Sequence, residues 1–397
     1  MFSRVMMRLI VVLGASLAAS SASAQSAGGV KPLPPSQVCI EDAGTQVCSG
    51  TPVGPTTLVG KMKWNPGNYV RADIQGFGSL QQARFDSYSA AFREPLIKGA
   101  VMLVNWGVVE NGGAGRYDFS VIDRELEFVR SKGRRLILEV WWHSFASNDV
   151  PAVPQQSDFR YLPDYVISGG GAAPSAVYGY MARIHDPKWM DRLIALFQEL
   201  GRRYNGDPAV EQIIISETSM NLRDPTFTAD ALTAQFKRLI PKAREAFPNT
   251  PVVIYMNWAG TQQSTTDLLA FGHQSGIGMG GPDILPPPPS GPYEDWGSQS
   301  LRGAGGSFGS VDYRGRIPVS YSFENPVNQG MQLKPDALYS YASSTLRATH
   351  LAWTYFTYKL PEQNWETGVL PAIRARNGAV ATACPTIYQG TCASTNP

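Results

Sequence analysis

Residues 190–216, with the sequence MDRLIALFQELGRRYNGDPAVEQIIIS, contain the pattern of one helix followed by one buried strand. Four apolar residues recur at the three- and four-residue spacing of an amphipathic helix: Met190, Leu193, Ile194 and Phe197. Residues 212–216 form a short, mostly apolar run, which is typical of a strand covered on both faces. This stretch therefore predicts one unit of alternating helix and strand.

The same alternation continues outward along the chain. Candidate strands are the short apolar or β-rich runs at residues 58–64, 100–104, 136–141, 212–216, 252–256, 276–280, 317–323 and 350–356. Helical stretches with one apolar face lie between several of them, for example around Leu126 and around Phe236. Because apolar strands alternating with helices form a covered parallel sheet, eight units predict an α/β fold, a single (β/α)8 TIM barrel. An open doubly wound sheet is the alternative, and the lack of a Gly-rich phosphate loop after the first strand disfavours it.

Two long insertions follow predicted strands. Residues 144–186 contain a triple glycine and several tyrosines, and residues 284–316 open with four prolines and are rich in Gly and Ser. In a barrel both insertions would rise from the carboxyl-terminal face, where active sites are built. Loops of this length are usually either functional or disordered, and mobile surface is the simpler interpretation of the Gly/Ser-rich one.

Composition and the amino terminus indicate an exported globular protein. The chain has 397 residues, of which 43% are hydrophobic and 17% are charged. Arg4 and Arg8, an apolar run over residues 9–17 and the site Ala22-Ser23-Ala24 predict a signal peptide over residues 1–24. Removing its two arginines takes the formal net charge from +2 to zero, so we expect no nucleic-acid partner. No later run approaches the ~20 apolar residues of a membrane span, so we expect no membrane association after cleavage. The periplasm and the extracellular medium both remain open.

The four cysteines form two local couples, which predicts two disulfides in an exported chain. Cys39 lies near Cys48, and Cys384 lies near Cys392. Three pairings of four cysteines are possible, and spacing alone does not exclude a bridge between the tails. A zinc site is the poorer interpretation because no histidine lies near either couple. The predicted organisation is a signal peptide at 1–24, an N-terminal extension at 25–56, a barrel at 57–375 and a C-terminal tail at 376–397.

Two glutamates follow predicted strands directly. Glu217 ends the run at 212–216, and Glu324 ends the run at 317–323. By count these strands are the fourth and seventh, so both carboxylates should reach the mouth of the barrel from facing sides. Two carboxylates across a groove are what glycosidic cleavage requires. The four histidines lack His-x-x-x-His spacing, so no metal and no other cofactor is expected.

Several segments resemble the clan A glycoside hydrolases, at a distance from their bacterial beta-galactosidase type. The resemblance is carried by GRYDFSVID at 115–123, KGRRLIL at 132–138, and DPKW, LGRRY and DPAV within 186–210. It implies that Glu217 is the general acid/base and Glu324 the nucleophile of a retaining mechanism. Ser216 stands where the clan has an Asn that binds the sugar 2-hydroxyl. The clan's strand-six Tyr has no counterpart in residues 276–280, and Tyr321 or Tyr355 would substitute for it.

Further substrate-binding candidates lie at or near strand ends: Trp106, Glu110, Trp142, His143, Asn257, Trp258 and Trp353. Aromatic faces stack on the apolar faces of sugar rings, and amide or imidazole groups bond the hydroxyls. The resemblance also implies that Trp353 is the tryptophan that floors the sugar subsite.

The sequence thus predicts an exported retaining glycoside hydrolase that attacks a polysaccharide or oligosaccharide within the chain. An inverting hydrolase with the same carboxylates is one alternative. A non-catalytic carbohydrate-binding barrel is the other, and the oligomeric state stays open.

Overall fold

The computed structural model describes residues 60–72, 81–143, 160–175, 179–219, 222–287, 294–323, 333–355 and 361–397, and the backbone of residues 38–42 and 45–49. The predicted signal peptide at 1–24 lies outside the described residues, as does Glu324. No helix in the described part of the chain is long and apolar enough to cross a membrane.

Eight parallel strands close into a barrel, which confirms the predicted fold. In barrel order they are β4 (Gly67–Arg71), β5 (Ile97–Asn105), β6 (Arg135–Trp141), β9 (Val210–Ile215), β10 (Val252–Tyr255), β11 (Gly278–Gly281), β12 (Val319–Phe323) and β13 (His350–Thr354), which pairs back with β4. Glu217 therefore follows the fourth barrel strand, and the seventh strand ends one residue before Glu324.

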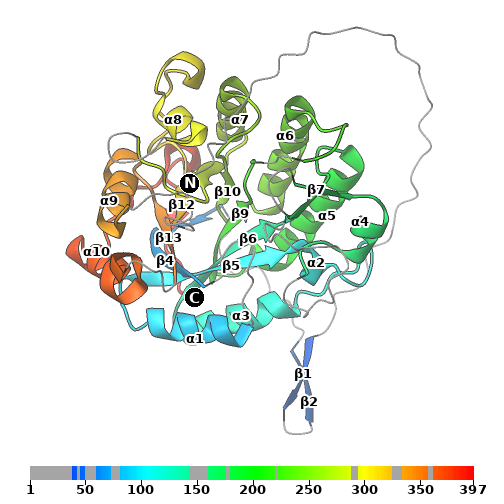
Figure 1. Ribbon diagram of the computed structural model, residues 1–397. Helices are drawn as coiled ribbons and strands as arrows, with labels where there is room; N and C mark the ends of the chain where they lie inside the picture. The colour runs from blue at the N-terminus through cyan, green and yellow to red at the C-terminus, as the bar shows by residue number, and fades with distance from the viewer. Residues whose placement is uncertain are drawn as a thin grey trace, which may run out of the picture. The chain divides into compact units, whose positions relative to one another are not determined.

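Helices surround the barrel on its outside (Figure 1). They are α1 (Gln81–Ala91), α2 (Trp106–Val109), α3 (Ser120–Ser131), α4 (Asp164–Ser168), α5 (Pro187–Tyr204), α6 (Ala229–Ala246), α7 (Gln262–Gln274), α8 (Trp296–Arg302), α9 (Pro335–Ser340) and α10 (Leu370–Ala375), with π-helical turns at Tyr341–Thr345 and Trp365–Val369. Helix α5 begins where the sequence signals it, because the Asp186 carboxylate accepts from the Lys188 amide and Pro187 opens the first turn. Its apolar stripe, which includes Leu193 and Phe197, is buried against the barrel.

The first barrel strand differs from the prediction. Residues 58–64 do not form it: Met62–Lys63 is a short strand, β3, which pairs with β14 (Cys392–Ala393) outside the barrel. The barrel strand is β4, whose sequence GNYVR lacks an apolar run. Its polar side chains have partners inside the fold, since Arg71 pairs with Glu139 and Asn68 accepts from Trp353. Tertiary hydrogen bonds thus make a strand where hydrophobicity does not indicate one.

The predicted Gly-rich sixth strand is confirmed as β11, and the close approach of its neighbouring strand requires glycine at two positions. A Cβ atom on Gly280 would lie 1.4 Å from the carbonyl oxygen of Ser320 in β12, and one on Gly278 would lie 2.4 Å from that of Pro318. The neighbouring backbone therefore approaches too closely for any side chain.

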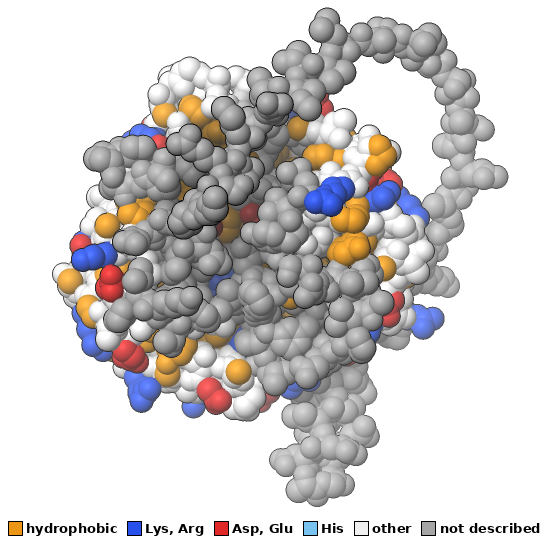
Figure 2. Space-filling view, viewed as in Figure 1, with side chains coloured by type: hydrophobic (Ala, Val, Ile, Leu, Met, Phe, Trp, Pro, Cys, Tyr) orange, Lys and Arg blue, Asp and Glu red, His pale blue; other side chains and the backbone are white. Residues whose placement is uncertain are grey.

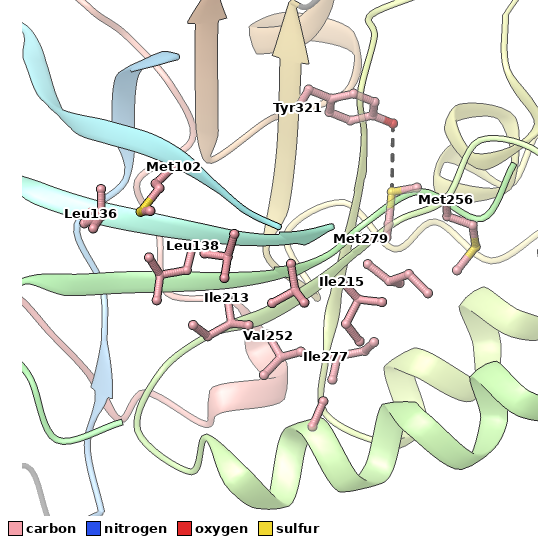
Figure 3. Packing of buried hydrophobic residues seen from close by; sticks show 14 of the residues in the cluster. Met102, Leu136, Leu138, Ile213, Ile215, Val252, Met256, Ile277, Met279 and Tyr321 are labelled. Carbon is pink, nitrogen blue, oxygen red and sulfur yellow. Dashed lines mark hydrogen bonds between the residues drawn. The ribbon is translucent and has the colours of Figure 1, made fainter. Parts of the chain in front are cut away.

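The pleat of the strands divides the core into two layers. An inner cluster fills the barrel and consists of Tyr69, Val101, Ile137, Ile214, Val253, Tyr255 and Ala352. A larger cluster lies between barrel and helices, and Figure 3 shows part of it, with Ile213, Ile215 and Val252 on the side of the strands that carries the helices. Because side chains alternate along each strand, the direction of one residue fixes that of its neighbours.

Both cysteine couples lie in local structures. Cys384 and Cys392 form a disulfide, as predicted. Strands β1 (Val38–Asp42) and β2 (Thr45–Ser49) form a hairpin in which Cys39 is the register partner of Cys48. The second disulfide stays a prediction, since only the backbone of this hairpin is described. The predicted domain boundaries also stay predictions.

Candidate active site

Glu217 lies at the carboxyl-terminal end of the barrel with two predicted residues beside it. Its Oε2 accepts a hydrogen bond from Asn257 Nδ2 at 2.7 Å, and its Oε1 lies 3.6 Å from His143 Nε2. The three side chains follow strands β9, β10 and β6, and each is at most 4% exposed. The fold therefore gathers a carboxylate, an amide and an imidazole from three adjacent strands.

The orientation of the Asn257 amide follows from its other contacts. Its Oδ1 accepts from the backbone N–H of Trp258 at 2.9 Å and from Thr218 Oγ1 at 3.3 Å. An amide oxygen that already has two donors leaves the NH2 group for Glu217. Asn257 thereby fixes the rotamer of the carboxylate. Trp258 itself is half-buried at the end of β10.

His143 lies on the inward side of β6 together with Trp141. The two rings are 4.4 Å apart, and the Arg71 guanidinium lies 5.5 Å from the centre of the Trp141 ring. Trp142, the predicted residue, instead points outward and packs near Phe236 of α6. Alternation sends residues 137, 139, 141 and 143 toward the interior and Trp142 toward the helices, so the substrate-binding role of Trp142 stays a prediction that this placement does not support.

A buried polar network missed by sequence reasoning lies below Glu217. Arg71 Nη1 donates to Glu139 Oε2 at 2.9 Å and to Ser322 Oγ at 3.2 Å, and Ser322 Oγ bonds the Tyr255 hydroxyl at 2.9 Å. Burial raises the pKa of Glu139 to about 7, with Arg71 opposing the rise and the nearby Glu217 adding to it. A signal was available: Glu139 interrupts the apolar run LILEVW, and a charge within a buried strand needs a partner.

Ser216 belongs to this network as well. Its Oγ donates to Glu139 Oε1 at 3.3 Å, so the hydroxyl that was expected to meet a sugar has a protein partner. Ser216 and Glu217 are consecutive residues just after β9. The hydrogen bond that holds Ser216 to Glu139 therefore also restrains the backbone of Glu217.

Trp106 and Glu110 contact each other and residues of the surrounding structure. Glu110 accepts from Trp106 Nε1 and from the Gly115 amide, each at 2.6 Å, and pairs with Arg192 of α5. Both predicted residues are fully buried. These contacts tie the end of α2 to α5 and occupy both oxygens of the Glu110 carboxylate, and the substrate-binding role of the two residues stays a prediction.

Tyr321 and Trp353 belong to the core layer between the barrel and the helices, and their substrate-binding roles stay predictions. The Tyr321 hydroxyl bonds Ser298 Oγ of α8 at 2.7 Å and lies 3.9 Å from Met279 Sδ (Figure 3). Trp353 stacks on Phe323 with ring centres 3.6 Å apart and donates to Asn68. Neither ring faces the barrel interior, where Tyr255 lies instead.

Tyr355 follows β13 and is only partly buried, with its ring centre 5.2 Å from that of Trp365. Glu324 lies outside the described residues, so its role stays a prediction.

Within the described ranges, no group of three or more His, Cys, Asp or Glu side chains is arranged to hold a metal ion. Figure 2 views the molecule from the side shown in Figure 1, and charged side chains of both signs are interspersed around its periphery.

The structure resembles solved glycosidases. The catalytic domain of beta-amylase from Paenibacillus polymyxa aligns with a TM-score of 0.55 at 10% identity, over 82% of this chain and all of that one. The endo-glycoceramidase II of a Rhodococcus species aligns at 0.44 and 12% identity, over 79% of each chain. A beta-galactosidase from the psychrophilic Marinomonas ef1 aligns at 0.45 and 10% identity, over 81% of this chain and 58% of that one.

No protein-family model matches the sequence, and neither does any curated protein. At such low identity the structural likeness concerns the fold alone. The chain has the (β/α)8 barrel in which the beta-amylase catalytic domain is built.

Proposed function

We propose that this protein is a retaining glycoside hydrolase with Glu217 as its general acid/base and Glu324 as its nucleophile. The observation that carries the proposal is the surroundings of Glu217: it lies two residues after the end of the fourth barrel strand, Asn257 donates to it at 2.7 Å, and His143 lies beside it. The carboxyl ends of barrel strands are where enzymes of this fold build their active sites. The neutral formal charge expected after signal cleavage and the half-buried Trp258 after β10 suit a glycan.

The chemistry has two displacements. Glu217 donates its proton to the glycosidic oxygen while the Glu324 carboxylate attacks the anomeric carbon, so the leaving group departs as an alcohol and a glycosyl ester forms. Glu217, now ionised, then takes a proton from water, whose oxygen attacks the same carbon and releases Glu324. Asn257 keeps the acid/base in one rotamer during both steps.

We further propose a polysaccharide as substrate, attacked within the chain. Support comes from the first long insertion, which contains the hairpin of β7 (Ala172–Pro174) and β8 (Tyr180–Ala182). Met181 of β8 forms a backbone bridge with His143, so the hairpin builds a wall directly next to Glu217. A wall on one side of the mouth suits a groove that holds several sugar units.

The activity is tested by measuring reducing ends released from a panel of plant and bacterial polysaccharides. We expect release by the native protein and a loss of about 10²–10⁴-fold in kcat for Glu217→Gln. Glu324→Gln should abolish release as well. Glu245→Gln is the matched control, since Glu245 is an exposed residue that pairs with Lys242 on α6.

The stereochemistry of the first product separates the alternatives. NMR of the fresh product should show a retained anomeric configuration, and a carboxyl separation of ~5 to 5.5 Å between Glu217 and Glu324 should accompany it. An inverted product, with a separation of ~6.5 to 9.5 Å, would assign the pair to an inverting mechanism. Binding of a polysaccharide without release would make the protein a carbohydrate-binding barrel.

Export is part of the proposal and rests on residues 1–24. Expression in a secreting bacterial host should yield a mature protein that begins at Gln25. Amino-terminal sequencing of the exported fraction checks this, and a chain retained in the cell with Met1 intact would contradict it.

A further inference from the structure

Glu139 is a buried carboxylate whose two oxygens are held by different strands. Arg71 of β4 donates to its Oε2 at 2.9 Å, and Ser216, which directly follows β9, donates to its Oε1 at 3.3 Å. The residue itself is fully buried on β6. A buried charge is costly unless it is paired, so these two contacts are what makes Glu139 tolerable there.

The network reaches the strand that precedes the second proposed catalytic carboxylate. Arg71 also donates to Ser322 of β12 at 3.2 Å, and Ser322 bonds Tyr255 of β10. One connected set of hydrogen bonds therefore joins β4, β6, β9, β10 and β12 across the interior. It includes the residue before Glu217 and the residue two positions before Glu324.

Another buried glutamate shows what a purely structural carboxylate looks like in this barrel. Glu211, near the start of β9, accepts two hydrogen bonds from Asn65 at 2.7 Å each and lies 3.2 Å from His350 Nε2. Burial alone would raise the pKa of Glu211, but these contacts hold it below its usual range. The pKa of Glu139 is instead raised to about 7, because burial and the neighbouring Glu217 outweigh Arg71.

We propose that Glu139 is a positioning residue for Glu217, which it holds through Ser216 and anchors through Arg71. The inference rests on the proposed acid/base role of Glu217. The charged and titratable groups around Glu139 are Arg71 from β4, Glu217 beyond β9, Tyr255 from β10 across Ser322, and His143, four residues after Glu139 and just beyond β6. Reacting groups displaced by about 1 Å lose on the order of 100-fold in rate, so a fixed strand end matters to this chemistry.

The test compares three variants of the full chain on the best polysaccharide from the panel. Glu139→Gln removes the charge, Ser216→Ala removes only the contact, and Glu211→Gln makes the same chemical change at the other end of the barrel. We expect kcat to fall about 10- to 100-fold in Glu139→Gln and about 3- to 10-fold in Ser216→Ala. KM should stay within about threefold in both, and Glu211→Gln should keep the native kcat per folded molecule.

The pH profile separates positioning from mere stability. An acid that loses a negative neighbour releases its proton at lower pH, so the alkaline limb of kcat/KM should move to lower pH in Glu139→Gln. The limb should stay in place in Ser216→Ala, because that variant keeps the charge. A native kcat and an unmoved limb in Glu139→Gln would overturn the inference. Should that variant fail to fold, a native kcat in Ser216→Ala overturns it equally.

Crystal structures of the variants give a readout that does not depend on activity. We expect the 2.7 Å contact between Glu217 Oε2 and Asn257 Nδ2 to be lost or lengthened in Glu139→Gln and kept in Glu211→Gln. An unchanged contact in both would overturn the positioning role. If the native protein cleaves no glycan, the proposed function fails, and these structures still decide whether Glu139 fixes Glu217.

Discussion

The two ends of the barrel hold similar polar residues in different ways. At the amino-terminal end, Glu211 has hydrogen-bond donors on both carboxylate oxygens, and the tail closes over it where Thr395 bonds Asn65. At the carboxyl-terminal end, Glu217 has Asn257 on one oxygen and His143 at 3.6 Å from the other. Glu211 is thus held where the strands begin, whereas Glu217 is held by residues that follow strands at the end of the barrel where enzymes of this fold build their active sites.

The largest effects are expected from two glutamine variants, one at each end of the barrel, which should change opposite properties of the protein. Glu217→Gln should lower kcat by about 10²–10⁴-fold and leave the free energy of unfolding nearly unchanged. Glu211→Gln should lower the free energy of unfolding by about 1–3 kcal/mol, because it leaves buried donors without an ionised acceptor, and should leave kcat unchanged. Urea unfolding and steady-state kinetics on both proteins check the pair. Equal effects on both quantities would break the comparison.

The disulfide lies at the amino-terminal end of the barrel, which the C-terminal tail closes and which we call the closed end. Its loss should therefore lower the free energy of unfolding and leave kcat unchanged. Cys384 and Cys392 lie eight positions apart in the sequence, and both pack against the cluster of Met62, Trp64 and Tyr388. Replacing both by Ser should cost about 2.5 kcal/mol by the loop-entropy relation. Denaturant unfolding of the double variant measures the cost. A fall in kcat at a temperature where the variant is fully folded would show that the two ends are coupled.

Lys63 at the closed end should give stability a pH dependence. Burial lowers its pKa from 10.5 to about 7, although Glu211 and Asp207 oppose the change. Between pH 7 and 10.5 the unfolded chain binds more protons than the folded one, so the free energy of unfolding should rise with pH. The contribution of this group has a slope of up to about 1.4 kcal/mol per pH unit.

Lys63→Met should remove that slope. Urea unfolding at several pH values between 7 and 10.5 compares the two proteins. Parallel curves for the native protein and the variant would contradict the depressed pKa of Lys63. A Lys61→Met variant is the control, since Lys61 is an exposed neighbour.

The smallest effects are expected when either of two buried tyrosines, Tyr255 inside the barrel or Tyr321 outside it, is replaced by Phe. Tyr255→Phe loses the bond to Ser322 inside the barrel, and Tyr321→Phe loses the bond to Ser298 outside it. Each should lower the free energy of unfolding by about 1 kcal/mol. Only Tyr255→Phe should also lower kcat, by a few-fold, because its network reaches the ends of β9 and β12. Steady-state kinetics of both variants under one set of conditions check this. A larger fall in kcat for Tyr321→Phe than for Tyr255→Phe would contradict the prediction.

Much of the barrel was predictable because its strands and helices are encoded locally. The run at 212–216 and the stripe of α5 carry their period in neighbouring residues, and the predicted strand ends placed Glu217 correctly after the fourth strand. The positions of His143 and Asn257 just after β6 and β10 were predicted on the same ground, since a polar residue just after an apolar strand points to the mouth of a barrel, and their contact with a substrate stays a prediction. Strand β4 was not predicted, because its polar side chains are stabilised by partners that lie far along the chain.

The sequence by itself therefore determined the order of the elements, the closed parallel sheet and the position of Glu217 at a strand end. Only the tertiary structure decided which side chains face inward: Trp141 and not Trp142, Tyr255 and not Tyr321. It alone also joined Arg71 to Glu139 across 68 residues and to Ser322 across 251. The physical reason is that helix and strand periods are set by near neighbours. The inward side of each strand and the partner of each buried charge are fixed only when distant strands close the barrel.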